Sequence, residues 1–179
     1  MSFLRTPDPN PGWLSDDELA ETRARVPMLY VEAVPVRVDA HGRVTTVGML
    51  LRVSETGFTR ALVSGRVRHG EEIRSALLRH VENDLGPTAM PQLPPSTVPF
   101  AVAEYFPWPG LSPLSDTRQH AVALAYVVPV AGDCEPRQDA LELAWLTPED
   151  AVSDSVVNEM EGGRGTLVRQ ALASVGCLP

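Results

Sequence analysis

The sequence contains no lysine: all 15 of its basic residues are arginine, against 23 acidic residues, and the formal net charge is -8. Without lysine the chain can form no Schiff base on a lysine side chain and has no lysine-bearing phosphate loop. The acidic balance excludes non-specific binding of DNA or RNA, which needs a basic surface to displace counterions. A nucleotide diphosphate is still an acceptable ligand, provided that a divalent cation lies between the charges.

Cysteines and long apolar runs are also scarce. Cys134 and Cys177 are the only cysteines, too few for a disulfide framework or a zinc knuckle. No apolar run approaches the ~18 residues of a membrane span, and the first ten residues lack the apolar core of a signal peptide. We therefore expect a cytoplasmic protein with free thiols that does not associate with membranes.

The composition is that of one folded domain: 179 residues, 44% hydrophobic and 21% charged. Residues 1–27 are expected to form an N-terminal leader and a short helix. Ser15 with Glu18 three residues later is a capping-box signature for the start of that helix. Residues 28–179 are expected to form the single domain.

Periodicity along the domain predicts strands interrupted by one central helix and closed by a C-terminal helix, an arrangement typical of a mixed sheet between helices. Pro35 indicates an edge strand or a bulge. The run at 120–130 is apolar enough for a central strand buried on both faces. The expected strands are 31–38, 44–53, 59–63, 98–106, 120–130 and 141–146, and the expected helices are 71–85, one starting at 147–150, and 165–174.

The segment from 65 to 86 is the most informative for function. A strand, a glycine-bearing loop and a helix with polar groups in its last turns are typical of a site for a polyanion with a metal. The helix has an apolar stripe that repeats every four residues, which should face the core. Beside it, His80, Asn83 and Asp84 share one side of the helix.

This segment resembles the box of the Nudix hydrolases. That box reads Gly, five residues, Glu, seven residues, then Arg-Glu-apolar-any-Glu-Glu-any-Gly-apolar. Gly65, Glu71, Arg79, Val81 and Gly86 match it at the right spacing. The resemblance covers about residues 28–175. It implies an α+β fold, namely a Nudix-like α/β/α sandwich with a mixed β-sheet. It also implies a metal-dependent hydrolase that cleaves the diphosphate bond of a nucleoside diphosphate linked to another group.

The sequence departs from the box at the carboxylates that bind the metal in the family. These positions fall on His80, Asn83 and Asp84, of which only Asp84 is acidic. Mg²⁺ prefers anionic oxygen, so we expect Mg²⁺ or Mn²⁺ to be weakly bound or absent, with the imidazole favouring Mn²⁺, Zn²⁺ or Ni²⁺. The alternative is an inactive nucleotide-binding or protein-interaction module. A homodimer is expected in either case.

The resemblance assigns candidate roles by position, although an ordinary solvated helix surface would explain several of these residues equally well. Glu142 is the candidate for a supplementary base. The candidates for catalysis are Glu71, Arg79, His80 and Glu142; those for binding the phosphate ligand are Gly65, Arg66 and Arg68; those for the metal are Asp84, Glu82 and Asn83.

Residues 87–118 hold eight of the 17 prolines and are expected to form a long irregular loop around one strand. Three aromatic residues lie together in it, Tyr105, Phe106 and Trp108. Their rings could stack on a base, make a dimer contact, or form a small core under the loop.

Overall fold

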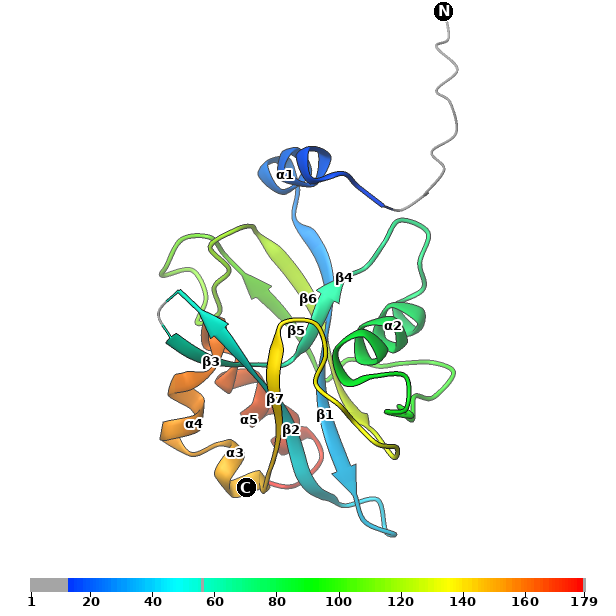
Figure 1. The fold of residues 1–179 in the computed structure, drawn as a ribbon. Helices are drawn as coiled ribbons and strands as arrows, with labels where there is room; N and C mark the ends of the chain where they lie inside the picture. The colour runs from blue at the N-terminus through cyan, green and yellow to red at the C-terminus, as the bar shows by residue number, and fades with distance from the viewer. Residues whose placement is uncertain (1–12, 56, 179) are drawn as a thin grey trace, which may run out of the picture.

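The computed structural model describes residues 13–55 and 57–178, which form a seven-stranded mixed sheet with helices on both sides (Figure 1). The leader predicted for residues 1–12 lies outside the described residues. The strands are β1 (Met28–Val38), β2 (Val44–Ser54), β3 (Gly57–Ala61), β4 (Val63–Arg66), β5 (Ala101–Tyr105), β6 (Ala121–Pro129) and β7 (Ala140–Leu146). The helices are α1 (Asp16–Arg25), α2 (Ile73–Leu85), α3 (Pro148–Ala151), α4 (Asp154–Glu159), the 3-10 turn η1 (Glu161–Gly163) and α5 (Gly165–Ser174).

Pro35 indicated an edge strand or a bulge; β1 is an interior strand, so the edge position is wrong. A register shift does lie in the pairing of β1 with β2, between Arg37 and Val38. On one side β1 pairs in parallel with β6. On the other it pairs with β4 up to Ala33 and with β2 from Val36 onwards. Pro35 lies where one neighbour has ended and the next has not begun. Its missing N–H, which faces that side, therefore removes no ladder hydrogen bond.

The segment 59–63, predicted as one strand, belongs to two. β3 pairs with β2 and β4 pairs with β1, and the buried Leu62 connects them. The chain thus passes from one neighbour to another in the middle of an apolar run, which periodicity alone cannot reveal. This change of partner brings β4, and the loop after it, beside the first half of β1.

The sheet separates two apolar cores. On one face, the α2 residues Leu77, Val81 and Leu85 are buried, as their four-residue spacing predicted. On the other face, α5 buries Leu167 and Leu172. Each such side chain contributes about 1.5–3 kcal/mol when fully buried. These contacts fix α2 and α5 on opposite faces of the sheet (Figure 1).

Most of the other predicted elements are confirmed. α1 begins with the predicted capping box, in which the Ser15 hydroxyl accepts from the Glu18 amide at 3.3 Å. β6 lies between β1 and β5, as expected of a central strand. Thr147 caps α3. α2 starts at Ile73, two residues later than predicted. The short α4 and η1, which lack an apolar repeat, were not predicted.

Within the part of the chain that the structure describes, no helix has the length and apolar character needed to cross a membrane.

Candidate functional site

A cavity of about 610 Å³ opens between β1, β4, β5 and the turn before α5, a size that suits a small-molecule ligand. Four arginines from four parts of the chain line it, and we call it the arginine cavity. They are Arg52 of β2, Arg66 of β4, Arg118 of the loop before β6 and Arg164 at the start of α5.

The cavity floor contains a buried carboxylate, Glu32 of β1, which is 0% exposed. The Tyr105 hydroxyl donates to its Oε2 at 2.5 Å, and Arg164 Nε donates to its Oε1. The Arg164 guanidinium also lies 4.7 Å above the Tyr105 ring. Burial and the neighbouring Glu32 raise the pKa of Tyr105, so its hydroxyl remains a donor. Both charges of this buried pair are therefore satisfied, as a buried ion pair requires.

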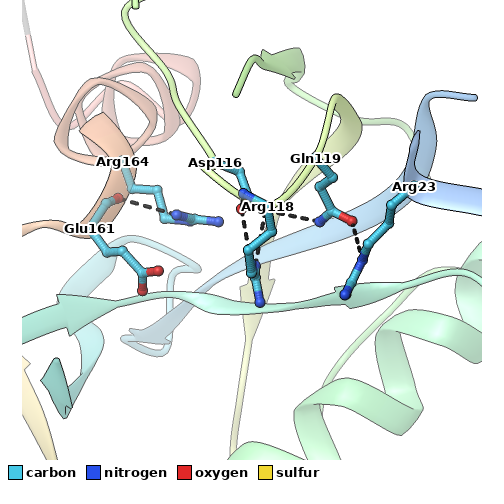
Figure 2. A network of polar contacts seen from close by, with 6 residues as sticks. All are labelled: Arg23, Asp116, Arg118, Gln119, Glu161 and Arg164. Atoms are coloured by element: carbon cyan, nitrogen blue, oxygen red, sulfur yellow. Dashed lines mark hydrogen bonds and ion pairs between the residues drawn. The ribbon is translucent and has the colours of Figure 1, made fainter. Parts of the chain in front are cut away.

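Arg118 is held at the cavity rim by Asp116. Its Nε and Nη2 donate to the two carboxylate oxygens of Asp116, each at 2.9 Å. Gln119 donates to the same carboxylate and accepts from Arg23 of α1, which links the rim to α1 (Figure 2). Burial would raise the pKa of Asp116, but the hydrogen bonds from Arg118 and Gln119 outweigh it and lower that pKa. The Arg118 side chain is 59% exposed, so it can still contact a ligand.

The backbone of Arg66 is held by hydrogen bonds from α2, the helix that carries the box. Its carbonyl accepts from Arg79 Nη2 at 2.9 Å and from His80 Nε2 at 3.1 Å. Its Nη1 atom is buried and has no hydrogen-bond partner among the described residues. Arg66 therefore lines the cavity from a firmly held backbone and has no ion-pair partner among the described residues.

Glu71 and Arg79 bind each other. Arg79 Nε and Nη2 donate to the two carboxylate oxygens at 2.7 and 2.8 Å, and the Arg68 amide donates to the same carboxylate at 2.9 Å. The hydrogen bonds from Arg79 lower the pKa of Glu71 to about 2. Both oxygens of Glu71 are thus engaged. The Arg68 guanidinium lies 4.4 Å above the ring of Trp13, outside the arginine cavity.

His80 packs its imidazole edge against β4 at Gly65. A Cβ on Gly65 would lie 1.8 Å from His80 Cε1 and 2.2 Å from either ring nitrogen, so only glycine leaves room for the ring. Because a carbonyl can only accept, the Nε2 atom that faces Arg66 carries the proton. Burial lowers the pKa of His80, so the ring is neutral near pH 7. Neither ring nitrogen points away from β4.

Asp84 is buried on α2, 3% exposed, and faces Arg52. Its Oδ1 lies 3.6 Å from Arg52 Nη2, and Arg52 Nε lies 3.4 Å from Asp139 Oδ1. Burial raises the pKa of Asp84 to about 6, although Arg52 opposes the change. Asp84 Oδ2 has no hydrogen-bond partner among the described residues.

The side chains of this helix do not fit a divalent cation. Mg²⁺ and Mn²⁺ need several oxygen donors, preferably anionic. Within residues 13–55 and 57–178, no three histidine, cysteine, aspartate or glutamate side chains are placed to hold a metal ion. Of the three predicted ligands, Glu82 and Asn83 are exposed and Asp84 is buried against Arg52.

The structure brings half of the ten predicted site residues together and leaves Glu142 apart. Gly65, Arg66, Glu71, Arg79 and His80 form one contiguous group through the contacts above. Glu142 is exposed on β7, in register with Leu51, and is not one of the residues that line the arginine cavity.

Sequence reasoning missed Glu32, Arg52, Arg118 and Arg164, which come from separate elements with no shared spacing. One signal was present: Glu32 is the only charged residue between Met28 and Val36, in a strand that is otherwise apolar or aromatic. A charged residue in an otherwise apolar strand needs a buried partner.

The aromatic loop divides between cavity and surface. Tyr105 joins the cavity floor, and the Phe106 ring stacks on His120 with 4.6 Å between centroids. Trp108 is 57% exposed. Tyr105 is 2% exposed and the Arg164 guanidinium lies over its ring, so this ring is not free to stack on a base.

Comparison with solved structures shows that the chain shares the fold of Nudix proteins. A possible asymmetric diadenosine tetraphosphate hydrolase from Jonesia denitrificans is 58% identical, with a TM-score of 0.84 over 87% of this chain and 98% of that one. The Nudix domain of Shewanella oneidensis NrtR, complexed with ADP ribose, is 16% identical, with a TM-score of 0.59 over 90% and 99% of the two chains. A Nudix hydrolase from Nitrosomonas europaea is 13% identical, with a TM-score of 0.60 over 86% and 93%.

Two further comparisons concern the sequence. A search of the curated proteins found no match. The family model described as a domain of unknown function, DUF4916, matches residues 9–177. The chain therefore belongs to the DUF4916 family, and its sandwich has the fold of the Nudix proteins.

Proposed function

We propose that the chain is a hydrolase of a nucleoside polyphosphate, which it takes into the arginine cavity. The observation that carries the proposal is the convergence of four arginines on one cavity beside the Nudix box. The planar, permanently charged guanidinium suits phosphate oxygens better than any other side chain. The Jonesia denitrificans relative, described as a possible diadenosine tetraphosphate hydrolase, supports the same ligand class.

The cavity is lined by as many acidic residues as arginines, but the arginines are not all paired with these acids. Its lining includes four acidic residues: Glu32, Asp116, Asp139 and Glu161. Glu32 is paired with Arg164, and Asp116 is paired with Arg118. Arg66 has no ion-pair partner among the described residues, and Arg118 is exposed beyond its pair. A polyphosphate would therefore contact Arg66 and Arg118 first, while the ring of Tyr30, which also lines the cavity, offers a surface for a base.

The chemistry of such a site is electrostatic. Donors fixed in advance around a phosphoryl group stabilise the charge that develops on its oxygens during attack by water. Arg79 and His80 hold Arg66 in place through its carbonyl, so these box residues would position the donor rather than touch the ligand. The metal that the family uses would supply Lewis-acid chemistry, but the donor set of α2 does not fit it. The role of Glu142 as a supplementary base stays a prediction.

A second candidate is binding of the same ligand without hydrolysis. The observation that favours it is the state of the box: Glu71 is fully engaged by Arg79, and Asp84 is paired with Arg52. In that case the protein would act as a nucleotide-responsive binding module.

One experiment separates the two candidates. Diadenosine tetraphosphate is titrated calorimetrically into the protein in chelator, Mg²⁺ and Mn²⁺, and the mixtures are then analysed for shorter nucleotides by chromatography. Micromolar binding with product formation supports the hydrolase; binding without product under all three conditions supports the binding module; no binding overturns both.

Arg118→Gln should weaken binding about tenfold, the worth of one charge-assisted hydrogen bond. Arg43→Gln, on an exposed turn between β1 and β2, is the matched control and should change nothing. The homodimer and the cytoplasmic location stay predictions; light scattering after gel filtration would check the first.

A further inference from the structure

Arg52 lies at the boundary between the arginine cavity and the Nudix box. It lines that cavity and also a second one, of about 440 Å³, which includes His80, Asn83 and Asp84. Its side chain is 22% exposed and reaches from β2 to α2. A single guanidinium therefore faces both the ligand cavity and the one carboxylate that remains of the box triad.

The position of Arg52 is that of a cation between two acids. Its Nη2 is 3.6 Å from Asp84 Oδ1, and its Nε is 3.4 Å from Asp139 Oδ1. Arg52 Nε and Asp84 Oδ2 are both buried without a hydrogen-bond partner among the described residues. The attraction is therefore ionic rather than a closed bidentate pair, and the guanidinium keeps donors for a further anion.

Arg66 adds a second arginine to the same cavity. Its Nη1 is buried and unpartnered within the described part of the chain, and its backbone is fixed by Arg79 and His80. Arg52 and Arg66 thus line one cavity without a closed hydrogen-bonded pair to a carboxylate. Arg118 and Arg164 are paired with Asp116 and Glu32, although the Arg118 side chain is still 59% exposed.

We propose that Arg52 takes the place of the divalent cation in this protein: it neutralises Asp84 and, together with Arg66, binds the phosphates of the ligand directly. This rests on the proposed function only in the choice of a polyphosphate as ligand. A divalent cation brought to Asp84 would meet a guanidinium at ion-pair distance, and it would find one carboxylate where it needs several anionic oxygens. Arginine, by contrast, binds phosphate through paired donors without dehydrating a metal ion.

The test uses inorganic tripolyphosphate as a probe, titrated calorimetrically in the presence of chelator. We expect binding to the unmodified protein, weakened at least tenfold in Arg52→Gln and in Arg66→Gln. Arg60→Gln is the matched control: Arg60 lies on the adjacent β3, pairs with Glu159 at 2.7 Å, and is 20% exposed, like Arg52. Arg52→Lys, which keeps the charge, should lie between Arg52→Gln and the unmodified protein.

A second readout follows the metal alone, by electron paramagnetic resonance of free Mn²⁺. The unmodified protein and Arg52→Lys should leave micromolar Mn²⁺ free, and Arg52→Gln with His80→Glu and Asn83→Glu should bind it. Circular dichroism melting confirms that each variant is folded. The proposal is overturned if tripolyphosphate binds only with Mn²⁺, or if the unmodified protein binds Mn²⁺ and Asp84→Asn abolishes that binding.

These outcomes are distinct from failure of the proposed function. Tripolyphosphate binding that depends on Arg52 and Arg66, with no binding of diadenosine tetraphosphate, would reject the nucleoside and keep the arginine site. Nucleotide binding that is indifferent to both arginines would do the reverse.

Discussion

The two faces of the sheet use charge in different ways. On the α2 face, the residues of the Nudix box bind one another: Glu71 with Arg79, and His80 with the backbone of β4. On the α5 face, Arg164 neutralises a carboxylate at the floor of a cavity that remains open to a ligand. The comparison teaches that the residues of the box hold the scaffold, whereas the groups that we propose bind a ligand come from outside the box or from its edge.

The largest effect should follow from breaking the buried pair on the α5 face. Arg164→Ala leaves Glu32 charged and without its cation at 0% exposure, which should cost about 3–5 kcal/mol in the free energy of unfolding. Denaturant unfolding measures it. Arg169→Ala, an exposed arginine on the same helix, is the control and should lose less than about 1 kcal/mol. Equal losses would mean that the Glu32 pair carries no special weight.

A smaller but specific effect is expected on the α2 face. Gly65→Ala places a methyl group against the His80 ring and should destabilise the protein by about 1–3 kcal/mol. In a double-mutant cycle, His80→Ala should remove most of that penalty, since the two side chains then no longer compete for one space. Additive losses would show that His80 does not pack where the structure places it.

The Glu71–Arg79 ion pair of the box should make the stability of the protein depend on pH in the acid range. Arg79 lowers the pKa of Glu71 from 4.5 to about 2, so the charged form is favoured in the folded state. The stabilisation is therefore present above pH 4.5 and is lost as the pH falls towards 2. Glu71→Gln should be less stable than the unmodified protein at pH 7, and the difference should shrink between pH 4.5 and 2. Urea unfolding at each pH tests this, with the exposed Glu72→Gln as a control that shows no such trend.

The smallest effect should come from a pair that belongs to neither face. Arg25 and Glu21 of α1 lie 2.8 Å apart but are 74% and 62% exposed. Arg25→Ala should change the free energy of unfolding by only about 0.2–0.5 kcal/mol. A loss as large as that of Arg164→Ala would contradict the contrast between buried and exposed pairs.

Much of the fold could be predicted from the sequence because several elements have strong local sequence signals. The four-residue stripe of α2, the capping box at Ser15 and the apolar run of β6 each report on their own element. The box spacing from Gly65 to Gly86 predicted the Nudix-like fold. Pro35 led to the wrong edge prediction because a proline in a strand shows only that a backbone N–H is missing. The sequence does not show why that N–H is not needed, which here is a change of neighbouring strand.

The candidate site was predicted only where it coincides with the box. Arg66 was identified by its place after Gly65, but Arg52, Arg118 and Arg164 lie on separate elements that meet only in the folded chain. The sequence also could not show that Asp84 faces Arg52, because β2 and α2 become neighbours only in the folded chain. Charges that act across elements leave no periodic trace.

The most direct test of the contrast between the two faces is calorimetric titration of diadenosine tetraphosphate in the presence of chelator. We predict that Asp84→Asn binds it at least as tightly as the unmodified protein, while Arg66→Gln binds it at least tenfold more weakly. Binding that needs Mn²⁺ and disappears in Asp84→Asn would contradict this, because the box carboxylate would then hold a metal and the ligand would depend on it.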